Sequence, residues 1–410
     1  MKPLAPIVLS CVAAGSALAL GACIVDLSNL SGGTRDGGAA GGGGNSASTT
    51  AATTGSDGAT TGAGGAASSS TTSSAGSGSG VGGMINPGCP GAVLDCSGCA
   101  CPAGGCDAVP LATGNDANGP RNIAVSSDGV FWSDTGDGRI MGIPAQGGAP
   151  QVFVKANAPT SLAVASGRIV YAAQDGVWTC LLATCSTTKD QLASSIAPGT
   201  VRSVAYDGQL AYWADRGDDA VAGNGKVWSC DPAAGCVALK QIAGQLLNPQ
   251  GLFLTTDSLF WIAQGNGNAN GSLHKSPRTG GGQTDLAAGL VLPTGLAADD
   301  TYVYWTQSTA SGAVLRCDHT QGYCDTPEDI APAAGPLGLP GDLALAGGRL
   351  YWNENTKGTI SSCPLPGCAA AEMPRVHATG RQGVNHLAAG SSCLFWTDLV
   401  SGGTVDKVGR

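Results

Sequence analysis

A two-part pattern that recurs seven times between residues 123 and 398 constrains the fold of this 410-residue chain more than any other feature. Each copy begins with a short apolar triplet, and successive triplets are 39, 42, 48, 44, 47 and 44 residues apart. A few residues later, six of the copies have an aromatic residue followed by tryptophan. The triplets are Ile123–Val125, Leu162–Val164, Val204–Tyr206, Leu252–Leu254, Leu296–Ala298, Leu343–Leu345 and Leu387–Ala389.

Each copy continues with a third apolar segment, a turn and a fourth segment such as Gln151–Val154 or Lys240–Ile242. Four short strands within about 40 to 45 residues are typical of one β-propeller blade. The chain has 66 glycines, which disfavours a helical protein, and it has no Gly-x-y period of a collagen. We therefore expect an all-β fold, a seven-bladed β-propeller, over residues 107–410.

All eight tryptophans lie in the second or third segment of a copy. This regular placement favours packing between blades over a carbohydrate-stacking platform, which is the alternative interpretation.

The second segments resemble the Tyr-Trp-Thr-Asp repeat of propellers of the low-density-lipoprotein-receptor type, and also related bacterial YWTD-like and NHL-like propellers. Tyr304–Thr306 and Tyr351–Trp352 are close matches, whereas Tyr171–Gln174 departs most because it lacks the tryptophan. Propellers of this family usually have six blades, so a six-bladed ring is the alternative to the seven counted here.

The last copy ends near Arg410 after its third segment, which leaves its blade one strand short. Cys106–Gly114, just before the first copy, matches Cys236–Gly244, which precedes the fourth copy. We therefore expect the N-terminal segment to supply the outer strand of the last blade. Such a clasp removes the free seam between the first and last blades.

The N-terminus has the features of a secretory signal over residues 1–22. Met1–Lys2 is basic, and the apolar run Pro6–Leu20 is too short to span a membrane. Leu20–Cys23 resembles the lipobox of bacterial lipoproteins, which implies cleavage before Cys23, a diacylglycerol on its thiol and acylation of the new amino terminus. Ordinary signal cleavage with an incidental thiol is the alternative. We expect a protein lipid-anchored in the bacterial cell envelope, with the outer membrane favoured, and exposed to the periplasm or the outside.

Residues 23–84 combine this lipid site with a polar linker. From residue 28 to residue 84, 18 of 57 residues are glycine, none is aromatic and only three are charged. Such a segment buries too little apolar surface to offset its ordering entropy, which predicts a disordered tether. The net charge of -9 and the absence of a basic run argue against a nucleic-acid partner.

Cysteine usage predicts disulfides formed in an oxidising compartment. Without Cys11 in the signal and Cys23, 14 of the 16 cysteines remain. Four pairs occupy the turn between the third and fourth segments, where each is predicted to close a hairpin: Cys180 with Cys185, Cys230 with Cys236, Cys317 with Cys324, and Cys363 with Cys368. A zinc site is disfavoured because each pair belongs to a different blade.

The other six cysteines are Cys89, Cys96, Cys99, Cys101, Cys106 and Cys393, the first five of them in a Cys-rich segment over residues 85–106. Their pairing is left open by the sequence. Because five is an odd number, complete oxidation within the chain requires one of these to reach Cys393, which supports the clasp. A redox role for the C-x-x-C at Cys96–Cys99 is disfavoured because no βαβ pattern surrounds it.

Recognisable catalytic patterns are absent from the sequence. It has four histidines, no paired metal-ligand motif, no phosphate-binding loop and no nucleophile elbow. The turns Asp134–Gly138 and Asp215–Asp219 gather carboxylates but lack the full calcium-loop spacing. We therefore predict no cofactor, with calcium as the only candidate. In the family that the chain resembles, the aspartate that ends the motif orders the blade, which implies a structural role for Asp134, Asp215 and Asp398.

Two functions remain. We favour a non-enzymatic binding or interaction scaffold whose partners are the membrane, through its lipid anchor, and an unidentified protein or glycan. The alternative is an envelope enzyme of the hydrolase, lactonase or lyase type with its site in the propeller funnel. Convergence of titratable groups in the funnel favours the enzyme, and a funnel of alanine, glycine and backbone favours the scaffold. The candidate catalytic residues are Glu354, Asp299, Asp300 and His386.

Overall fold

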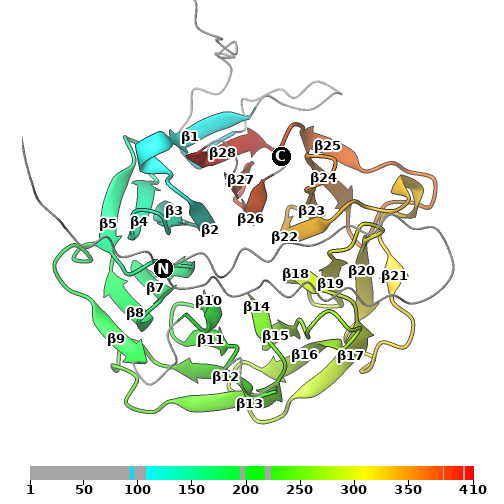
Figure 1. Ribbon diagram of the computed structural model, residues 1–410, viewed down its shortest axis with the longest axis horizontal. Coiled ribbons are helices and arrows are strands. Elements are labelled where there is room, and N and C mark those ends of the chain that lie inside the picture. Colours follow the sequence, from blue (N-terminus) through cyan, green and yellow to red (C-terminus); the bar gives the residue numbers. More distant parts are fainter. Residues whose placement is uncertain (1–92, 97–107, 194–198, 218–222, 382, 400–401) are drawn as a thin grey trace, which may run out of the picture. The chain divides into compact units, whose positions relative to one another are not determined.

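A computed structural model describes residues 93–96, 108–193, 199–217, 223–381, 383–399 and 402–410. These residues form seven antiparallel four-stranded sheets arranged as a ring (Figure 1), which confirms the seven-bladed propeller and excludes the six-bladed alternative. All of them belong to a compact unit that begins at Gly80. The predicted signal peptide and linker, together with Cys23, Cys89, Cys99, Cys101 and Cys106, lie outside the described residues.

Six blades are each built from four consecutive strands, ordered from the inner to the outer edge of the ring. Blade 1 contains β2 (Pro120–Ser126), β3 (Gly129–Asp134), β4 (Arg139–Pro144) and β5 (Gln151–Lys155). Blade 2 contains β6 (Ser161–Ala165), β7 (Arg168–Ala173), β8 (Gly176–Leu181) and β9 (Asp190–Ala193). Blade 3 contains β10 (Val201–Tyr206), β11 (Ala211–Asp215), β12 (Gly225–Cys230) and β13 (Lys240–Leu246). Blade 4 contains β14 (Pro249–Leu254), β15 (Ser258–Ala263), β16 (Gly271–Pro277) and β17 (Thr284–Leu290).

Blade 5 contains β18 (Pro293–Ala298), β19 (Tyr302–Gln307), β20 (Ala313–Asp318) and β21 (Glu328–Asp329). Blade 6 contains β22 (Pro340–Ala346), β23 (Arg349–Glu354), β24 (Thr359–Pro364) and β25 (Arg375–Ala378). Two short 3-10 helices, Gly114–Asp116 and Pro332–Ala334, complete the described elements. Within these residues no helix is long and apolar enough to cross a membrane.

Blade 7 closes the ring with strands from both ends of the chain. It contains β26 (Val384–Ala389), β27 (Cys393–Asp398) and β28 (Thr404–Gly409), and its outer strand is β1 (Val109–Thr113). β1 runs antiparallel to β28, with Val109 opposite Lys407 and Thr113 opposite Thr404. A disulfide between Cys96 and Cys393 fastens the segment that precedes β1 to the same blade. The predicted clasp is therefore confirmed, and Cys96 is the partner of Cys393.

The aromatic pairs explain how neighbouring blades pack. Successive residues of a strand point to opposite faces of its sheet. In blade 1, Phe131 accordingly joins the apolar cluster shared with blade 2, whereas Trp132 joins the cluster shared with blade 7. Six tryptophans in equivalent positions are buried between blades, as predicted: Trp132, Trp213, Trp261, Trp305, Trp352 and Trp396. Trp178 and Trp228, in the third strands, are half-buried under the ammonium groups of Lys189 and Lys226.

Blade 2 corrects the alignment of the second segments. The sequence pattern places Tyr171 where other copies have the aromatic residue that precedes tryptophan. In the sheet, Tyr171 lies opposite Leu162, just as Trp132 lies opposite Ile123. Tyr171 therefore occupies the tryptophan position, facing blade 1, and Val170 occupies the preceding aromatic position. Strand pairing decides the alignment, because a shift of one residue would exchange the two faces of the sheet.

The four predicted hairpin disulfides are present, each linking the third strand of a blade to the turn that follows. They join Cys180 to Cys185, Cys230 to Cys236, Cys317 to Cys324, and Cys363 to Cys368.

Candidate functional site

The seven inner strands begin at one end of the ring, around a polar cavity of about 400 Å³ that we call the mouth. Its wall is formed chiefly by the two residues that immediately precede each apolar triplet. The first residues of these pairs are Arg121, Thr160, Arg202, Gln250, Thr294, Gly341 and Asn385. The second residues are Asn122, Ser161, Ser203, Gly251, Gly295, Asp342 and His386. Every blade therefore contributes to one shared surface.

In four blades the second residue of the pair joins its blade to the next one. The Oδ1 of Asn122 accepts a hydrogen bond from the backbone N–H of Leu162 at 3.0 Å, and the Oγ of Ser161 accepts one from Val204 at 3.1 Å. Ser203 and Asp342 accept equivalent bonds in blades 3 and 6. These N–H groups belong to the first residue of the next triplet, so the polar side chain satisfies a backbone donor at the blade boundary.

Glycine takes this position in blades 4 and 5. A Cβ added at Gly295 would lie 2.5 Å from the carbonyl oxygen of Gly341, so only glycine fits this close approach between blades 5 and 6. Thr306 connects the two backbones instead. Its Oγ1 accepts a hydrogen bond from the N–H of Gly295 at 2.7 Å and donates one to the carbonyl of Gly341 at 2.6 Å.

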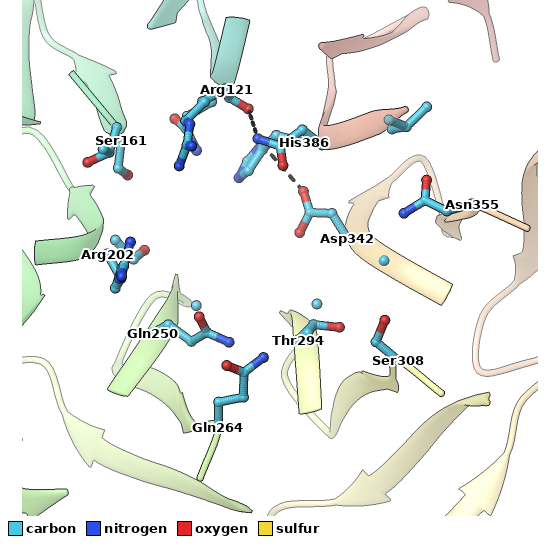
Figure 2. Close-up of a pocket in the computed structure, with 18 residues that line it drawn as sticks. Arg121, Ser161, Arg202, Gln250, Gln264, Thr294, Ser308, Asp342, Asn355 and His386 are labelled. Carbon is cyan, nitrogen blue, oxygen red and sulfur yellow. Dashed lines mark hydrogen bonds and ion pairs between the residues drawn. The ribbon is translucent and has the colours of Figure 1, made fainter. Parts of the chain in front are cut away.

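Cationic and anionic groups lie on different sides of the mouth (Figure 2). Arg121 and Arg202 flank Ser161 on one side, and the side chains of both arginines are exposed. His386 lies between Arg121 and Asp342 (Figure 2), and its Nδ1 is 3.4 Å from the Oδ2 of Asp342. That carboxylate oxygen also accepts the N–H of Leu387 at 2.8 Å, so the aspartate is engaged by its own surroundings. The charged side chains that line the mouth are thus two guanidinium groups, one carboxylate and the imidazole of His386.

Uncharged polar groups complete the wall. Gln264, Ser308 and Asn355 reach the mouth from the residues that follow the second strands of blades 4, 5 and 6. Asn248 donates a hydrogen bond to the Oε1 of Gln264 at 3.0 Å, and Asn353 donates one to the Oδ1 of Asn355 at 3.0 Å. These bonds orient amide groups at the rim, which therefore presents both donors and acceptors to a ligand.

Of the four candidate catalytic residues, the structure places His386 in the mouth and the other three elsewhere. Asp299 and Asp300 follow β18 at the far end of the inner strand. The carboxylate of Asp299 accepts hydrogen bonds from the N–H groups of Thr301 and Tyr302 and from the hydroxyl of Tyr304, so it orders a turn. Glu354 ends β23, is only 4% exposed, and pairs with the ammonium of Lys357 at 2.9 Å. These four residues therefore do not converge, so the convergence that would favour the enzyme alternative is not found among them.

The funnel is also not the surface of alanine, glycine and backbone that would mark an inert scaffold. The sequence analysis did not identify Arg121, Arg202 and Asp342, because its pattern was defined by the apolar triplets that follow them. A signal for them was present, since each triplet follows proline or a small residue by a few positions and the residues between are mostly polar.

The acidic turn in blade 1 is neutralised by one arginine. Arg139 pairs with the buried carboxylate of Asp134 at 2.9 Å and with Asp137 at 2.8 Å. The structural role of Asp134 follows from these contacts. In blade 3, Asp215 accepts the N–H of Gly217 at 3.0 Å, while Asp218 and Asp219 lie outside the described residues. Within the described part of the chain, no group of three or more metal-ligating side chains gathers at one place.

A Ser–His–Asp chain lies away from the mouth in blade 4. The Oγ of Ser272 is 2.7 Å from the Nε2 of His274, and the Nδ1 of His274 is 2.8 Å from the Oδ1 of Asp285. This connectivity is that of a serine hydrolase triad. Ser272, however, is paired on both sides within the sheet, opposite Ala263 and Ala288, so the adjacent backbone is committed to the ladder and not to an oxyanion hole. We interpret the contacts among Ser272, His274 and Asp285 as a structural connection between β16 and β17.

No protein-family model matches the chain, and comparison with curated proteins finds no match. Among solved structures, the Kuenenia stuttgartiensis hydrazine synthase is similar, with a TM-score of 0.56, 12% identity, and coverage of 72% of this chain and 97% of that chain. An aldose sugar dehydrogenase from Streptomyces coelicolor has a TM-score of 0.46, 14% identity, and coverage of 76% and 99%. A gluconolactonase from Xanthomonas campestris has a TM-score of 0.45, 16% identity, and coverage of 74% and 90%. At these identities the likeness shows the fold alone.

Proposed function

We propose that this chain is a lipid-anchored envelope protein whose propeller binds a small anionic ligand at the mouth of its central channel. The observation that carries the proposal is the mouth itself, where Arg121 and Arg202 face a rim of amides and hydroxyls drawn from every blade. Guanidinium groups bind carboxylates and phosphates with charge-assisted hydrogen bonds. The rim supplies the few polar groups that orient a ligand in a concave site.

Saturation-transfer NMR with lactate and gluconate as probes tests this binding. Both probes carry a carboxylate for the arginines and hydroxyl groups for the rim. We expect transfer to both in the wild type and its loss in the double variant Arg121→Gln/Arg202→Gln. Arg375→Gln on the exposed outer strand of blade 6 is a matched control, which makes the same change outside the mouth and should keep the signal. Equal signals in the wild type and the double variant would contradict the proposal.

The anchor is the second part of the proposal. Leu20–Cys23 resembles a lipobox, and the acyl chains of such a lipid each add about 0.8 kcal/mol of membrane affinity per buried CH₂. Expression with a clickable palmitate analogue should label the wild type and not Cys23→Ser, which should leave the membrane fraction. A membrane-bound and labelled Cys23→Ser protein would refute the anchor without touching the ligand site.

The YWTD-like class belongs to the proposal as well. It is supported by the aromatic–tryptophan pairs in six blades and by Asp134, whose buried carboxylate organises the turn after β3. The seven blades depart from the usual number in that family.

A second candidate function is an enzyme in the same funnel, of the hydrolase, lactonase or lyase type. The observation that favours it is the pair of His386 and Asp342, in which a carboxylate orients an imidazole next to the arginines. Turnover of a panel of lactones and esters, abolished by His386→Asn with binding retained, would replace the binding function with this one. No turnover by the wild type would leave the binding module.

A further inference from the structure

Beneath the mouth, the channel wall changes from polar to apolar. A second cavity of about 290 Å³ shares Ser203, Gly251, Thr294, Asp342 and His386 with the mouth, so the two adjoin one another. The rest of its wall consists of residues of the triplets: Ile123, Leu252, Phe253, Leu296, Leu343, Ala344, Leu345, Leu387, Ala388 and Ala389.

The residue order along the inner strands explains this change from a polar to an apolar wall. Each inner strand has its polar pair at the mouth, and the triplets of blades 1, 4, 5, 6 and 7 line the channel beyond it, so depth in the channel corresponds to position in the strand. Phe253 adds the largest apolar surface, since the middle residue of the triplet is alanine in the other six blades. The side chains of Phe253, Leu345 and Ala388 are half-buried.

We propose that the ligand is an amphipathic carboxylate that places its anionic head at Arg121 and Arg202 and its hydrocarbon part in the apolar channel. The inference rests on the proposed binding at the mouth and adds the class of ligand. A wholly polar ligand would leave hydroxyl groups unpaired against the triplets, which is unfavourable, whereas a hydrocarbon chain releases water from that wall.

The charges of the mouth select an anion. The Oδ2 of Asp342 is already engaged by Leu387 and lies near His386, so it does not dominate the field of the cavity. Arg121 and Arg202 bring two positive charges to the opposite side. A hydrocarbon with an ammonium head would meet repulsion there, and one with a carboxylate head meets attraction.

Calorimetric titration with acetate, butanoate, hexanoate and octanoate tests the inference. Each added CH₂ buried in the channel should tighten binding about fourfold, the equivalent of about 0.8 kcal/mol. The double variant Arg121→Gln/Arg202→Gln should weaken binding of every member of the series about tenfold, because it removes the head contacts and keeps the channel.

Channel variants locate the hydrocarbon part. Leu345→Asn should reduce the dependence of affinity on chain length. Ala388→Asp, which puts a negative charge on the wall, should abolish octanoate binding. Leu181→Asn, on an exposed leucine of the blade 2 hairpin, is the matched control and should behave as the wild type. A melting curve of each variant identifies any that fails to fold, and the other then carries the test.

The outcomes separate the two proposals. Equal affinity for acetate and octanoate, with loss of both in the arginine variant, overturns the amphipathic ligand and retains anion binding at the mouth. Absence of carboxylate binding in the wild type overturns both.

Discussion

The side chain of Ser161, on the inner strand of blade 2, forms a hydrogen bond to the inner strand of blade 3. Ser161 is 3% exposed, and its hydroxyl accepts the N–H of Val204, which is itself buried. An unsatisfied backbone N–H in a buried position costs more than the bond itself contributes. The same residue also lines the mouth, so one position serves both stability and the surface that meets the ligand.

Replacement of Ser161 by alanine should therefore lower the free energy of unfolding by about 1 to 3 kcal/mol. Ser308→Ala is the control, because Ser308 lines the mouth without such a blade-to-blade bond and its loss should cost less than about 0.5 kcal/mol. Urea unfolding of both variants measures the difference. Equal stabilities would show that the bond at Val204 contributes nothing.

His377 gives the stability of the molecule a dependence on pH. It is fully buried, with its Nε2 2.8 Å from the Oγ of Ser362, and burial, followed by the charges of Arg375 and Arg349, lowers the pKa of His377 to about 4. The unfolded chain binds a proton with the ordinary pKa of 6.5, and the folded chain does not until about 4. Stability is thus lost as the pH falls through this interval.

Unfolding at pH 7, 6, 5 and 4 should show a steeper loss of stability for the wild type than for His377→Gln. Parallel curves for the two proteins would exclude His377 as a source of the pH dependence.

Elements are joined by two kinds of disulfide with different effects. The Cys180–Cys185 bond closes a hairpin with a sequence separation of 5, whereas Cys96–Cys393 spans 297 residues. In the loop-entropy model the first contributes about 2 kcal/mol and the second more than about 4 kcal/mol, because the longer loop constrains the unfolded chain more.

The double variant Cys96→Ser/Cys393→Ser should accordingly lower the urea midpoint more than Cys180→Ser/Cys185→Ser does. A larger effect of the hairpin pair would mean that the long bond acts on a segment that opens before the ring unfolds.

The sequence predicts the positions of strands and hairpins correctly where a local pattern determines the structure. The period of the triplets located every inner strand, and the paired cysteines located the hairpins. It was insufficient at Tyr171, where the alignment depends on pairing with Leu162 across the sheet. In that copy the aromatic–tryptophan pair is missing, so the local pattern contained no marker for the correct register.

The propeller is a ring whose first and last strands share one sheet. β1 is held by its ladder with β28, and Val93 and Cys96 pack in the cluster that joins blades 7 and 1. Deletion of residues 106–114 removes β1 and exposes an unpaired edge at β28. Tm should fall sharply, as measured by calorimetry, and an unchanged Tm would show that the ring closes without its clasp.

The sequence contains the polar residues before each triplet, but it does not show that they share one site. Arg121, Arg202 and Asp342 are separated by up to 221 positions and become neighbours only because seven inner strands start at the same end of one ring. Asp299 and Glu354 carry carboxylates as Asp342 does, but Asp299 orders a turn and Glu354 pairs with Lys357. Closure of the ring therefore decides which polar residues face the channel.

A crystal structure of the protein with octanoate tests whether the channel is the ligand site. We predict the carboxylate within hydrogen-bond distance of the guanidinium of Arg121 or Arg202, with the hydrocarbon chain along Phe253 and Leu345. An empty channel at a saturating concentration, or octanoate bound only to the outer strands, would show that the ligand site lies elsewhere.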